Sequence, residues 1–453
     1  MKRMYTDDRG SAGEKLLGKI KRARVKVRNT CRVIAGQEVR KRHIACEGPA
    51  YVFVSGIMGT GEQSSFEHIV PYWGLFQGDL LMRLEEYGYP CYAAAVGPVS
   101  SAWDRACELY AMLCGGTVDY GAAHSEKHGH ARYGRAYSPM FEGWSREKPV
   151  HLLGHSFGGA TVRLFAQLCA EGSGEERAAT TMGELSPLFA GGMTDRVLSV
   201  TCLASPHNGT TAACSIQKGQ RTWTFLPIYS LLSLAGTLPV LNGVYDLHLE
   251  HFGLSNPNGK FFGNMYNPKK LNAFIKSRDH ATADLSLDGA REINECVPAR
   301  PELPYFSYPC VVTRPRPTPL GGREFPPLGE IKDPVMMLYG LQMGLGLGNR
   351  VMKTLPDGAE IPDPCWLQND GAVPLASARC PSGQPHREFS PKAALRPGIW
   401  NIMPTRYGAD HGYYCGWDVN NKDFEALVQF YLEHFRLLER ACAGYRARAA
   451  SAA

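Results

Sequence analysis

The chain has 453 residues, of which 44% are apolar and 20% are charged, and its aromatic residues comprise 21 Tyr, 18 Phe and 7 Trp. This composition is typical of a folded globular protein and excludes disordered, low-complexity and fibrous classes. The formal net charge is +6, but residues 1–42 alone carry a net charge of +10, so the remaining residues carry −4. The charge of the body therefore argues against a nucleic-acid partner.

Residues 1–48 are predicted to form a basic, flexible N-terminal extension. A folded unit follows over residues 49–442, and residues 443–453 are predicted to form a C-terminal tail. The extension lacks the continuous apolar stretch of a secretory signal, so we do not expect export by that route. The extension also carries scattered Leu, Ile and Val residues beside many basic ones. Because such a segment can bind anionic lipid, this contact is left open.

Cysteine usage and apolar tracts bear on the compartment. The 14 cysteines include no Cys-x-x-Cys pair, which indicates reduced thiols rather than a zinc ribbon or a dense disulfide scaffold. The longest apolar tracts, residues 226–241 and 335–348, are short and interrupted by Pro or Gly, so no membrane span is predicted. We therefore expect an intracellular protein, either cytoplasmic or peripheral on a membrane or lipid droplet.

Apolar β-branched runs alternate with helical patterns along the folded unit. Strands are predicted over 51–54, 91–96, 150–153 and 197–203, and helices over 78–87, from 103 onward, over 159–170 and over 424–438. Residues 115–139 are rich in Gly and His with little periodicity and are predicted to be an ordered loop insertion, and Pro-rich residues 298–334 a loop excursion. The alternation predicts a mostly parallel sheet covered by helices on both faces.

The pentapeptide Gly154-His155-Ser156-Phe157-Gly158 matches the Gly-x-Ser-x-Gly pattern of a nucleophile turn. So short a pattern can occur by chance, and a Gly-Ser turn without chemistry is the alternative. Here, however, it lies between an apolar strand and a helical pattern, which is the context that the chemistry requires. The two glycines permit a tight turn that exposes the serine hydroxyl at the carboxyl edge of the sheet, above a helix N-terminus that favours negative charge.

A serine alcohol needs a base and an orienting acid, which follow it in the order Asp, His in this kind of fold. Asp370 lies in an Asn-Asp-Gly segment, and His411 lies in a Gly-flanked segment before the C-terminal helix. Taken alone, the first is more often a plain turn and the second a surface residue. Their order behind Ser156 favours the catalytic interpretation.

Histidines concentrate in the Gly-rich insertion. His124, His128 and His130 lie there, with Asp104 and Asp119 nearby in sequence. Two imidazoles and two carboxylates neutralise a dication and suit tetrahedral zinc. The alternative is a loop whose histidines are hydrogen-bonded and solvated.

Over residues 51–438 the chain resembles the zinc-containing thermoalkalophilic bacterial triacylglycerol lipases and their eukaryotic-type homologues, within the α/β-hydrolase superfamily. The resemblance is carried by long segments, namely residues 95–108, 115–124, 127–135, 198–201, 205–211 and 244–246, together with Ser156. It implies an α/β-hydrolase fold with a mostly parallel central sheet, a zinc-binding insertion over about 104–139 and a helical lid over about 212–245. The apolar lid segment is equally compatible with an ordinary core helix.

By this resemblance Ser156 is the nucleophile, Asp370 the orienting acid and His411 the general base. The backbone N–H groups of Ile57 and Phe157 form the oxyanion hole, and the location of both next to the strand ends favours the same pair on physical grounds. The chain departs from the bacterial pattern at Ser55-Gly56-Ile57, where those lipases carry His-Gly-Phe, and at Gly154, where they tend to have Ala. Backbone donation survives both changes, whereas the lining of the acyl pocket differs.

The resemblance also implies metal sites. The zinc ligands fall on Asp104, His124, His130 and Asp279, with Asp284 as the rival for the fourth position; four protein ligands make the ion structural. For calcium, the corresponding ligands are Asp418, the backbone of Val419 and Gly329. Tyr413 replaces an acidic ligand, which weakens attraction for a hard dication, so a calcium site is left open.

The sequence thus predicts a triacylglycerol lipase that acts on lipid esters through a Ser-His-Asp triad and an acyl-enzyme intermediate. Action at a lipid–water interface and peripheral membrane contact are both left open. A phospholipase or acyltransferase of the same fold is one alternative. The other is a non-catalytic ligand-binding protein, because this fold also hosts receptors.

Overall fold

The computed structural model describes residues 43–44 and 48–451, apart from positions 63, 65–66, 68–69, 76, 182, 214–245, 255–267, 319–320, 332, 347–363 and 418–420. Most of the predicted N-terminal extension and lid therefore lie outside the described residues. None of the helices in the described part combines the length and apolar character needed to cross a bilayer.

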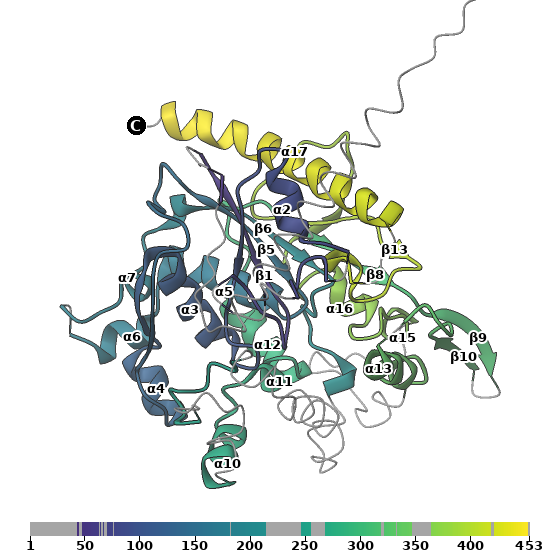
Figure 1. Cartoon of the computed structure of the whole chain (residues 1–453), viewed down its shortest axis with the longest axis horizontal. Coiled ribbons are helices and arrows are strands. Elements are labelled where there is room, and N and C mark those ends of the chain that lie inside the picture. The colour runs from purple at the N-terminus through teal and green to yellow at the C-terminus, as the bar shows by residue number, and fades with distance from the viewer. Residues whose placement is uncertain are drawn as a thin grey trace, which may run out of the picture.

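A seven-stranded sheet forms the centre of the molecule (Figure 1). Its strands lie in the order β11 (His386–Glu388), β12 (Trp400–Ile402), β7 (Tyr305–Tyr308), β6 (Val197–Leu203), β5 (Val150–His155), β1 (Ala50–Val54) and β2 (Cys91–Ala94). All neighbouring strands pair in parallel. The predicted α/β architecture with a parallel sheet is confirmed.

Helices and smaller strands surround this sheet. The helices are α2 (Leu80–Glu85), α3 (Ala102–Cys114), α4 (Ala122–His128), α5 (Gly158–Glu171), α6 (Gly174–Ala179), α7 (Pro187–Ala190), α10 (Pro268–Ser277), α11 (Ala281–Asp284), α12 (Leu287–Cys296), α13 (Pro334–Gly344), α15 (Pro364–Leu367), α16 (Leu375–Arg379) and α17 (Asn421–Ser451), with short 3-10 turns η1 (Thr194–Arg196) and η2 (Tyr413–Cys415). The smaller strands pair as β3 (Gly116–Asp119) with β4 (Tyr133–Tyr137), β9 (Arg314–Thr318) with β10 (Gly321–Phe325), and β8 (Cys310–Val311) with β13 (Arg406–Tyr407).

The alternation of side chains along β1 divides the apolar core into two layers. Val52 and Val54 join a cluster with residues of α3 and α5 on one face, whereas Tyr51 and Phe53 join a second cluster with residues of α2 and α17 on the other. Figure 1 shows α17 running along the opposite side of the sheet from α3. Each fully buried large apolar side chain contributes roughly 1.5–3 kcal/mol, so both faces fix the sheet edge that carries Ser156.

Two expectations from the sequence are wrong. Residues 115–139 are not a plain loop but contain the β3–β4 hairpin and α4. Their periodicity is weak because β3 buries only Val118 fully, and half of it faces solvent. Residues 298–334 are not a loop excursion either, since they include β7, a strand of the central sheet. Prolines flank β7 rather than interrupt it, and the prolines inside β9 lie in an exposed two-stranded ribbon, where they are tolerated.

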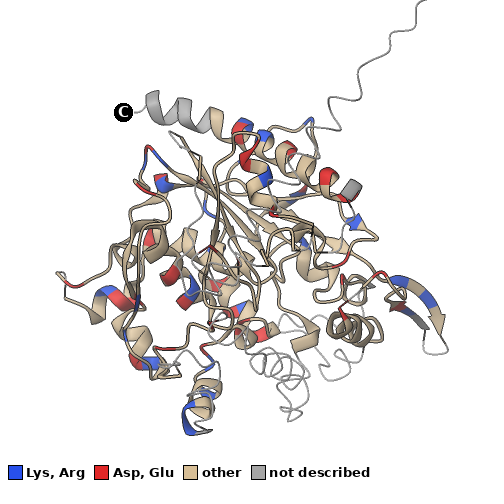
Figure 2. Cartoon of the chain, in the orientation of Figure 1, with Lys and Arg blue, Asp and Glu red and all other residues tan. Residues whose placement is uncertain are grey.

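The C-terminal helix α17 continues to Ser451, through most of the stretch that the sequence suggested as a tail. Charged residues lie mainly on peripheral helices and loops (Figure 2). Helix α3 is an exception, because Asp104, Arg105 and Glu108 are each fully buried. Buried charges need partners, and those of α3 border the two sites described next.

Candidate active site and metal site

Ser156 occupies a strained turn between β5 and α5. Its φ angle is +53°, in the left-handed region that non-glycine residues rarely adopt, and its N–H donates to Leu203 O at 2.9 Å. A Cβ at Gly154 would lie 2.4 Å from the backbone of Gly158, and a Cβ at Gly158 would lie 2.3 Å from Val54 O. Both glycines are therefore required sterically, and the turn holds Ser156 at the N-terminal end of α5.

Asp370 and His411 come from distant loops and form a hydrogen-bonded pair. His411 Nδ1–H donates to Asp370 Oδ2 at 2.8 Å, and the His411 backbone N–H donates to Asp370 O at 2.8 Å. The other carboxylate oxygen accepts from the N–H groups of Ala372 and Val373, at 2.9 and 2.8 Å. Both side chains are buried, so the carboxylate and the imidazole plane are fixed.

The protonation of His411 follows from this pairing. Burial lowers the pKa of its imidazole, while the Asp370 carboxylate and its hydrogen bond raise it by more, so the pKa of His411 lies above its ordinary value. In the neutral form, the proton resides on Nδ1 and leaves Nε2 as the basic nitrogen.

His155 connects the nucleophile turn to the His411 loop. His155 Nε2–H donates to His411 O at 2.8 Å, and the two rings lie 4.8 Å apart. Ser156 is the next residue, which brings all three predicted catalytic residues to one edge of the sheet. Among the described residues, no hydrogen bond joins Ser156 Oγ to His411 directly.

The two predicted oxyanion donors have free N–H groups. Neither the Ile57 N–H nor the Phe157 N–H donates to any acceptor in the described part of the chain. The turn that holds Ile57 lies against the nucleophile, since a Cβ on Gly56 would lie 2.8 Å from Ser156 Cβ and 3.2 Å from Ser156 Oγ. Free donors beside a serine hydroxyl can stabilise negative charge that develops there.

Sequence reasoning missed a hydrogen-bonded chain that ties these parts together. The Gly56 N–H donates to Tyr72 Oη at 2.9 Å, and Tyr72 Oη lies 2.7 Å from His155 Nδ1. Burial, and secondarily His411, lowers the pKa of His155 well below its ordinary value. Its imidazole is therefore neutral, and its Nδ1 accepts a hydrogen bond from the Tyr72 hydroxyl. Tyr72 gave no signal in the sequence, whereas His155 could have been noticed as a polar residue within a buried strand.

The predicted zinc ligands Asp104, His124, His130 and Asp279 converge. One candidate ligand atom from each lies within 4.8 Å of the others. Asp279 Oδ2 lies 3.1 Å from Nε2 of both histidines, and Asp104 Oδ1 lies 3.4 Å from His124 Nε2. Burial lowers the pKa of His124, but the two carboxylates raise it to about 9. The cluster therefore attracts positive charge.

Orphaned atoms show that the donor set fits a metal ion. Asp104 Oδ1 and His130 Nε2 are buried and make no hydrogen bond with the described residues, although unpaired buried polar atoms are costly. Asp104 Oδ2 accepts from His251 Nε2–H at 2.9 Å, which orients the carboxylate as outer partners of metal ligands do. The rival Asp284 lies outside the cluster and accepts from the Ala102 N–H at 2.7 Å, at the start of α3.

The calcium ligands predicted from the sequence are only partly described. Asp418 and Val419 lie outside the described residues, and Gly329 lies in an exposed turn with φ +83°. Tyr413, at the position where the resemblance implies an acidic ligand in the relatives, has the guanidinium of Arg406 over its ring at 4.3 Å. A cation already faces this side chain, and the calcium prediction stays untested.

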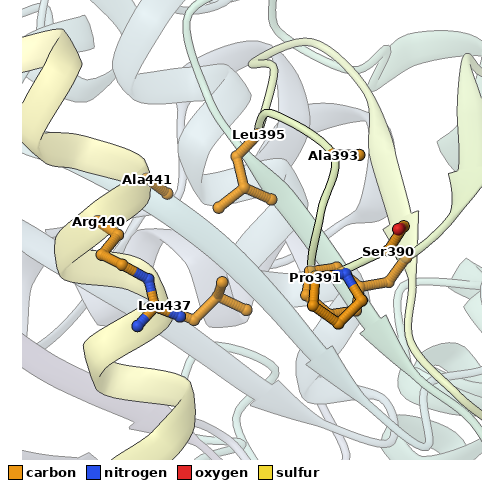
Figure 3. A pocket seen from close by; sticks show the side chains of 8 residues that line it. Ser390, Pro391, Ala393, Leu395, Leu437, Arg440 and Ala441 are labelled. Carbon is orange, nitrogen blue, oxygen red and sulfur yellow. The ribbon is translucent and has the colours of Figure 1, made fainter.

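Two surface hollows are lined by none of the three predicted catalytic residues. One, of about 320 Å³, lies between α17 and the loop from Phe389 to Leu395 (Figure 3). The other, of about 690 Å³, borders the loop that leads into His411 and is lined by residues 404–409. Neither is lined by Ser156 or Asp370. The predicted lid lies outside the described residues except Ala212 and Ala213, which are buried.

Proteins similar to this chain are known over most of its length. The model of the family described as "Lipase-like, C-terminal domain" matches residues 48–440. A lipase of Staphylococcus hyicus is 34% identical over 387 residues, which cover 84% of this chain and 56% of that protein. Lipase 2 of Staphylococcus aureus strain MSSA476 is 34% identical over 373 residues, which cover 81% of this chain and 50% of that protein. The chain thus spans about half the length of these curated relatives.

Solved structures resemble the chain over almost its whole folded part. EstA from Clostridium botulinum has a TM-score of 0.73 and 34% identity, with 86% of this chain and 88% of that chain covered. The crystal structure of Staphylococcus hyicus lipase has a TM-score of 0.71 and 30% identity, with 90% of this chain and 99% of that chain covered. These structures confirm the fold class predicted from the sequence.

Proposed function

Because the chain belongs to the lipase-like, C-terminal domain family, we propose that it is a serine carboxylester hydrolase that acts on lipid esters, triacylglycerols first among them. The observation that carries the proposal is the buried His411–Asp370 pair, which His155 links to the strained Ser156 turn. The names of the staphylococcal relatives, which are lipases, support the substrate class.

In the proposed mechanism, Ser156 Oγ attacks the ester carbonyl while His411 Nε2 accepts its proton. Asp370 holds the imidazole in the tautomer with the proton on Nδ1 and stabilises the imidazolium that forms. The N–H groups of Ile57 and Phe157 donate to the oxyanion. His411 then protonates the leaving alcohol, which leaves an acyl-enzyme, and the same residues assist a water molecule in releasing the fatty acid.

We further propose that the ion held by Asp104, His124, His130 and Asp279 is zinc. Two imidazoles and two carboxylates form a neutral tetrahedral set with zinc, and the fully used donor set favours a structural role. Zinc bound there would link α3, the α4 segment and the Asp279 loop. These residues position that part of the fold, and no step of ester hydrolysis depends on a metal-bound group.

The proposal is tested by hydrolysis of p-nitrophenyl butyrate and palmitate and of emulsified triolein by the wild type and by Ser156→Ala. We expect the variant to lose about 10⁴- to 10⁶-fold in kcat, because the nucleophile is gone. Equal rates for the two proteins would refute the assignment of Ser156. Product analysis with phospholipid and with an acceptor alcohol distinguishes a phospholipase or an acyltransferase, and a wild type inactive on all substrates would favour a binding protein.

A lipid–water interface is the proposed site of action. Rates with monomeric tributyrin below its solubility limit, compared with rates above it, test this point. A discontinuous rise above the limit supports interfacial action, and a hyperbolic curve through the limit contradicts it.

A further inference from the structure

Arg105 is a fully buried cation that contacts both halves of the proposed oxyanion hole. It lies on α3, directly after Asp104. Its guanidinium donates from Nη2 to Ser55 O and from Nη1 to Gly56 O, the latter at 3.3 Å. The same group lies over the ring of Phe157, with 4.9 Å from Cζ to the ring centroid.

The contact with Gly56 O helps to fix the direction of the Ile57 N–H, together with the Gly59 N–H, which donates to the same oxygen at 3.2 Å. In a trans peptide the C=O and the N–H of one plane point to opposite sides, and the Gly56 carbonyl shares its plane with the Ile57 N–H. When the carbonyl faces Arg105, the Ile57 N–H faces away from it. Rotation of this peptide by half a turn would break the contact and reverse the oxyanion donor.

The preceding peptide plane is held at both ends. Its carbonyl, Ser55 O, accepts from Arg105, and its N–H, on Gly56, donates to Tyr72 Oη at 2.9 Å. Two successive planes are therefore fixed just before Ile57. Since Gly56 has no side chain to restrict its backbone, fixing of this kind is needed there.

The positive charge adds a second effect. A carbonyl that accepts from a cation polarises its peptide group, which strengthens the N–H of the same group as a donor. The N–H of Ile57 becomes a stronger hydrogen-bond donor in this way. The cation over the aromatic face also restrains Phe157, whose own N–H is the second oxyanion donor.

We propose that Arg105 is a positioning residue for the oxyanion hole, which locks the Gly56–Ile57 peptide and the Phe157 ring so that both N–H groups aim at the oxyanion. The inference rests on the proposed ester hydrolysis. The planar fork of arginine reaches two carbonyls while its face stacks on a ring, which the single ammonium of lysine cannot do. Arg105→Lys should therefore restore only part of the function lost in Arg105→Met.

The test compares a p-nitrophenyl ester with the matching thionoester, in which sulfur replaces the carbonyl oxygen. Sulfur is a larger and weaker acceptor, so an intact oxyanion hole favours the oxygen ester. In Arg105→Met we expect kcat for the oxygen ester to fall about 10- to 100-fold, with KM changed less than about threefold, and the oxygen-to-sulfur rate ratio to fall about tenfold. Because both substrates are measured on one preparation, the ratio is independent of the folded fraction.

Arg163→Met is the matched control. Arg163 is also a buried arginine, donates to Asn294 Oδ1 and Val297 O, and lies over the ring of Trp400 at 5.7 Å, without touching the oxyanion turn. Its loss should lower stability but leave the oxygen-to-sulfur ratio as in the wild type.

The outcomes separate this inference from the proposed function. If Arg105→Met keeps the wild-type ratio, the inference is refuted; if that variant yields no folded protein, a wild-type ratio in Arg105→Lys refutes it equally. If the wild type hydrolyses neither ester, or Ser156→Ala hydrolyses both as fast, the proposed function itself fails.

Discussion

The catalytic edge and the metal cluster both hold polar atoms that make no hydrogen bond with the described residues, but these atoms are of opposite kinds. At the catalytic edge the free groups are donors, the N–H groups of Ile57 and Phe157. In the cluster they are acceptor atoms, Asp104 Oδ1 and His130 Nε2. Free donors can stabilise the short-lived oxyanion of the proposed reaction, whereas free acceptors can bind a permanent metal cation. The type of the unsatisfied atom therefore indicates the charge of what binds there.

Helix α3 joins the two regions. Asp104 faces the metal cluster and Arg105, the next residue, faces the oxyanion turn. One helix thus carries an acidic ligand for the permanent cation and a basic group that organises donors for a transient anion. The predictions below perturb one region at a time.

The largest effect is expected at the catalytic acid. Asp370→Asn should lower kcat about 10⁴-fold, because an amide in place of the carboxylate no longer holds His411 in the required tautomer or stabilises its charged form. Steady-state kinetics with a short-chain ester measure this. Asp410→Asn is the control: it removes the same charge beside His411, but its carboxylate accepts from the Gly412 N–H, whereas the His411 ring donates to Asp370. The fall in kcat should therefore be far smaller in Asp410→Asn. Equal losses would contradict the triad.

Acid pH should reduce activity through His411. Only the neutral imidazole accepts the serine proton, and the raised pKa of His411 keeps it protonated to higher pH than a free imidazole of pKa 6.5. The acidic limb of kcat/KM should have its midpoint above 6.5 and fall about tenfold for each pH unit below it. A midpoint below 6.5 would contradict the His411–Asp370 pairing.

The same shift has the opposite sign for stability. A raised folded-state pKa means that protonation of His411 favours the fold at low pH, and that this contribution disappears as pH rises through the raised value. Acid loss of activity should therefore occur without unfolding driven by His411. Thermal unfolding recorded at each pH of the profile checks this.

Removal of the metal should act on stability. His130→Ala, or chelation of the wild type, should abolish the bound ion and lower Tm on the order of 3 °C, as expected for a fold of this size on loss of a ligand present at about a hundredfold its Kd. Elemental analysis and calorimetry measure both. His128→Ala is the control, because His128 bonds Ser277 O and is not in the cluster; it should retain the metal. A wild type purified without any metal would refute the site.

The smallest effect is expected at Tyr72. Tyr72→Phe leaves the Gly56 N–H and His155 Nδ1 unpaired, which should cost about 1–3 kcal/mol of stability and lower kcat severalfold. Tyr431→Phe is the control, because it removes another buried hydroxyl. The Tyr431 hydroxyl donates to Tyr414 O at 2.7 Å and makes no hydrogen bond with the nucleophile turn in the described part of the chain. This substitution should cost similar stability with unchanged kcat. Equal kcat values for the two variants would remove Tyr72 from the catalytic edge.

Local chemistry explains which features were predictable. The strands around Ser156 are mostly apolar and every residue in them is buried, and the two glycines of the turn are required sterically, so motif and context agree. The chain order of Asp370 and His411 identified a pair that the fold then joins. The four residues of the metal cluster were named through the family resemblance, because Asp279 is distant in sequence from the histidines.

Other features depend on tertiary contacts that no local pattern records. Tyr72 contacts Gly56 and His155 only because the chain folds back over the sheet edge. Arg105 looked like one more charged helix residue, and only its full burial against Ser55 O and Gly56 O distinguishes it. The β3–β4 hairpin was missed because its short, half-exposed strands lack an apolar period.

The most direct test of the central claim is covalent trapping of the nucleophile with a p-nitrophenyl alkylphosphonate, followed by peptide mass spectrometry. The account predicts one adduct per chain, on Ser156, formed in step with the loss of esterase activity and absent in Ser156→Ala. An adduct on a different residue that abolishes activity, or full inactivation with Ser156 unmodified, would contradict it.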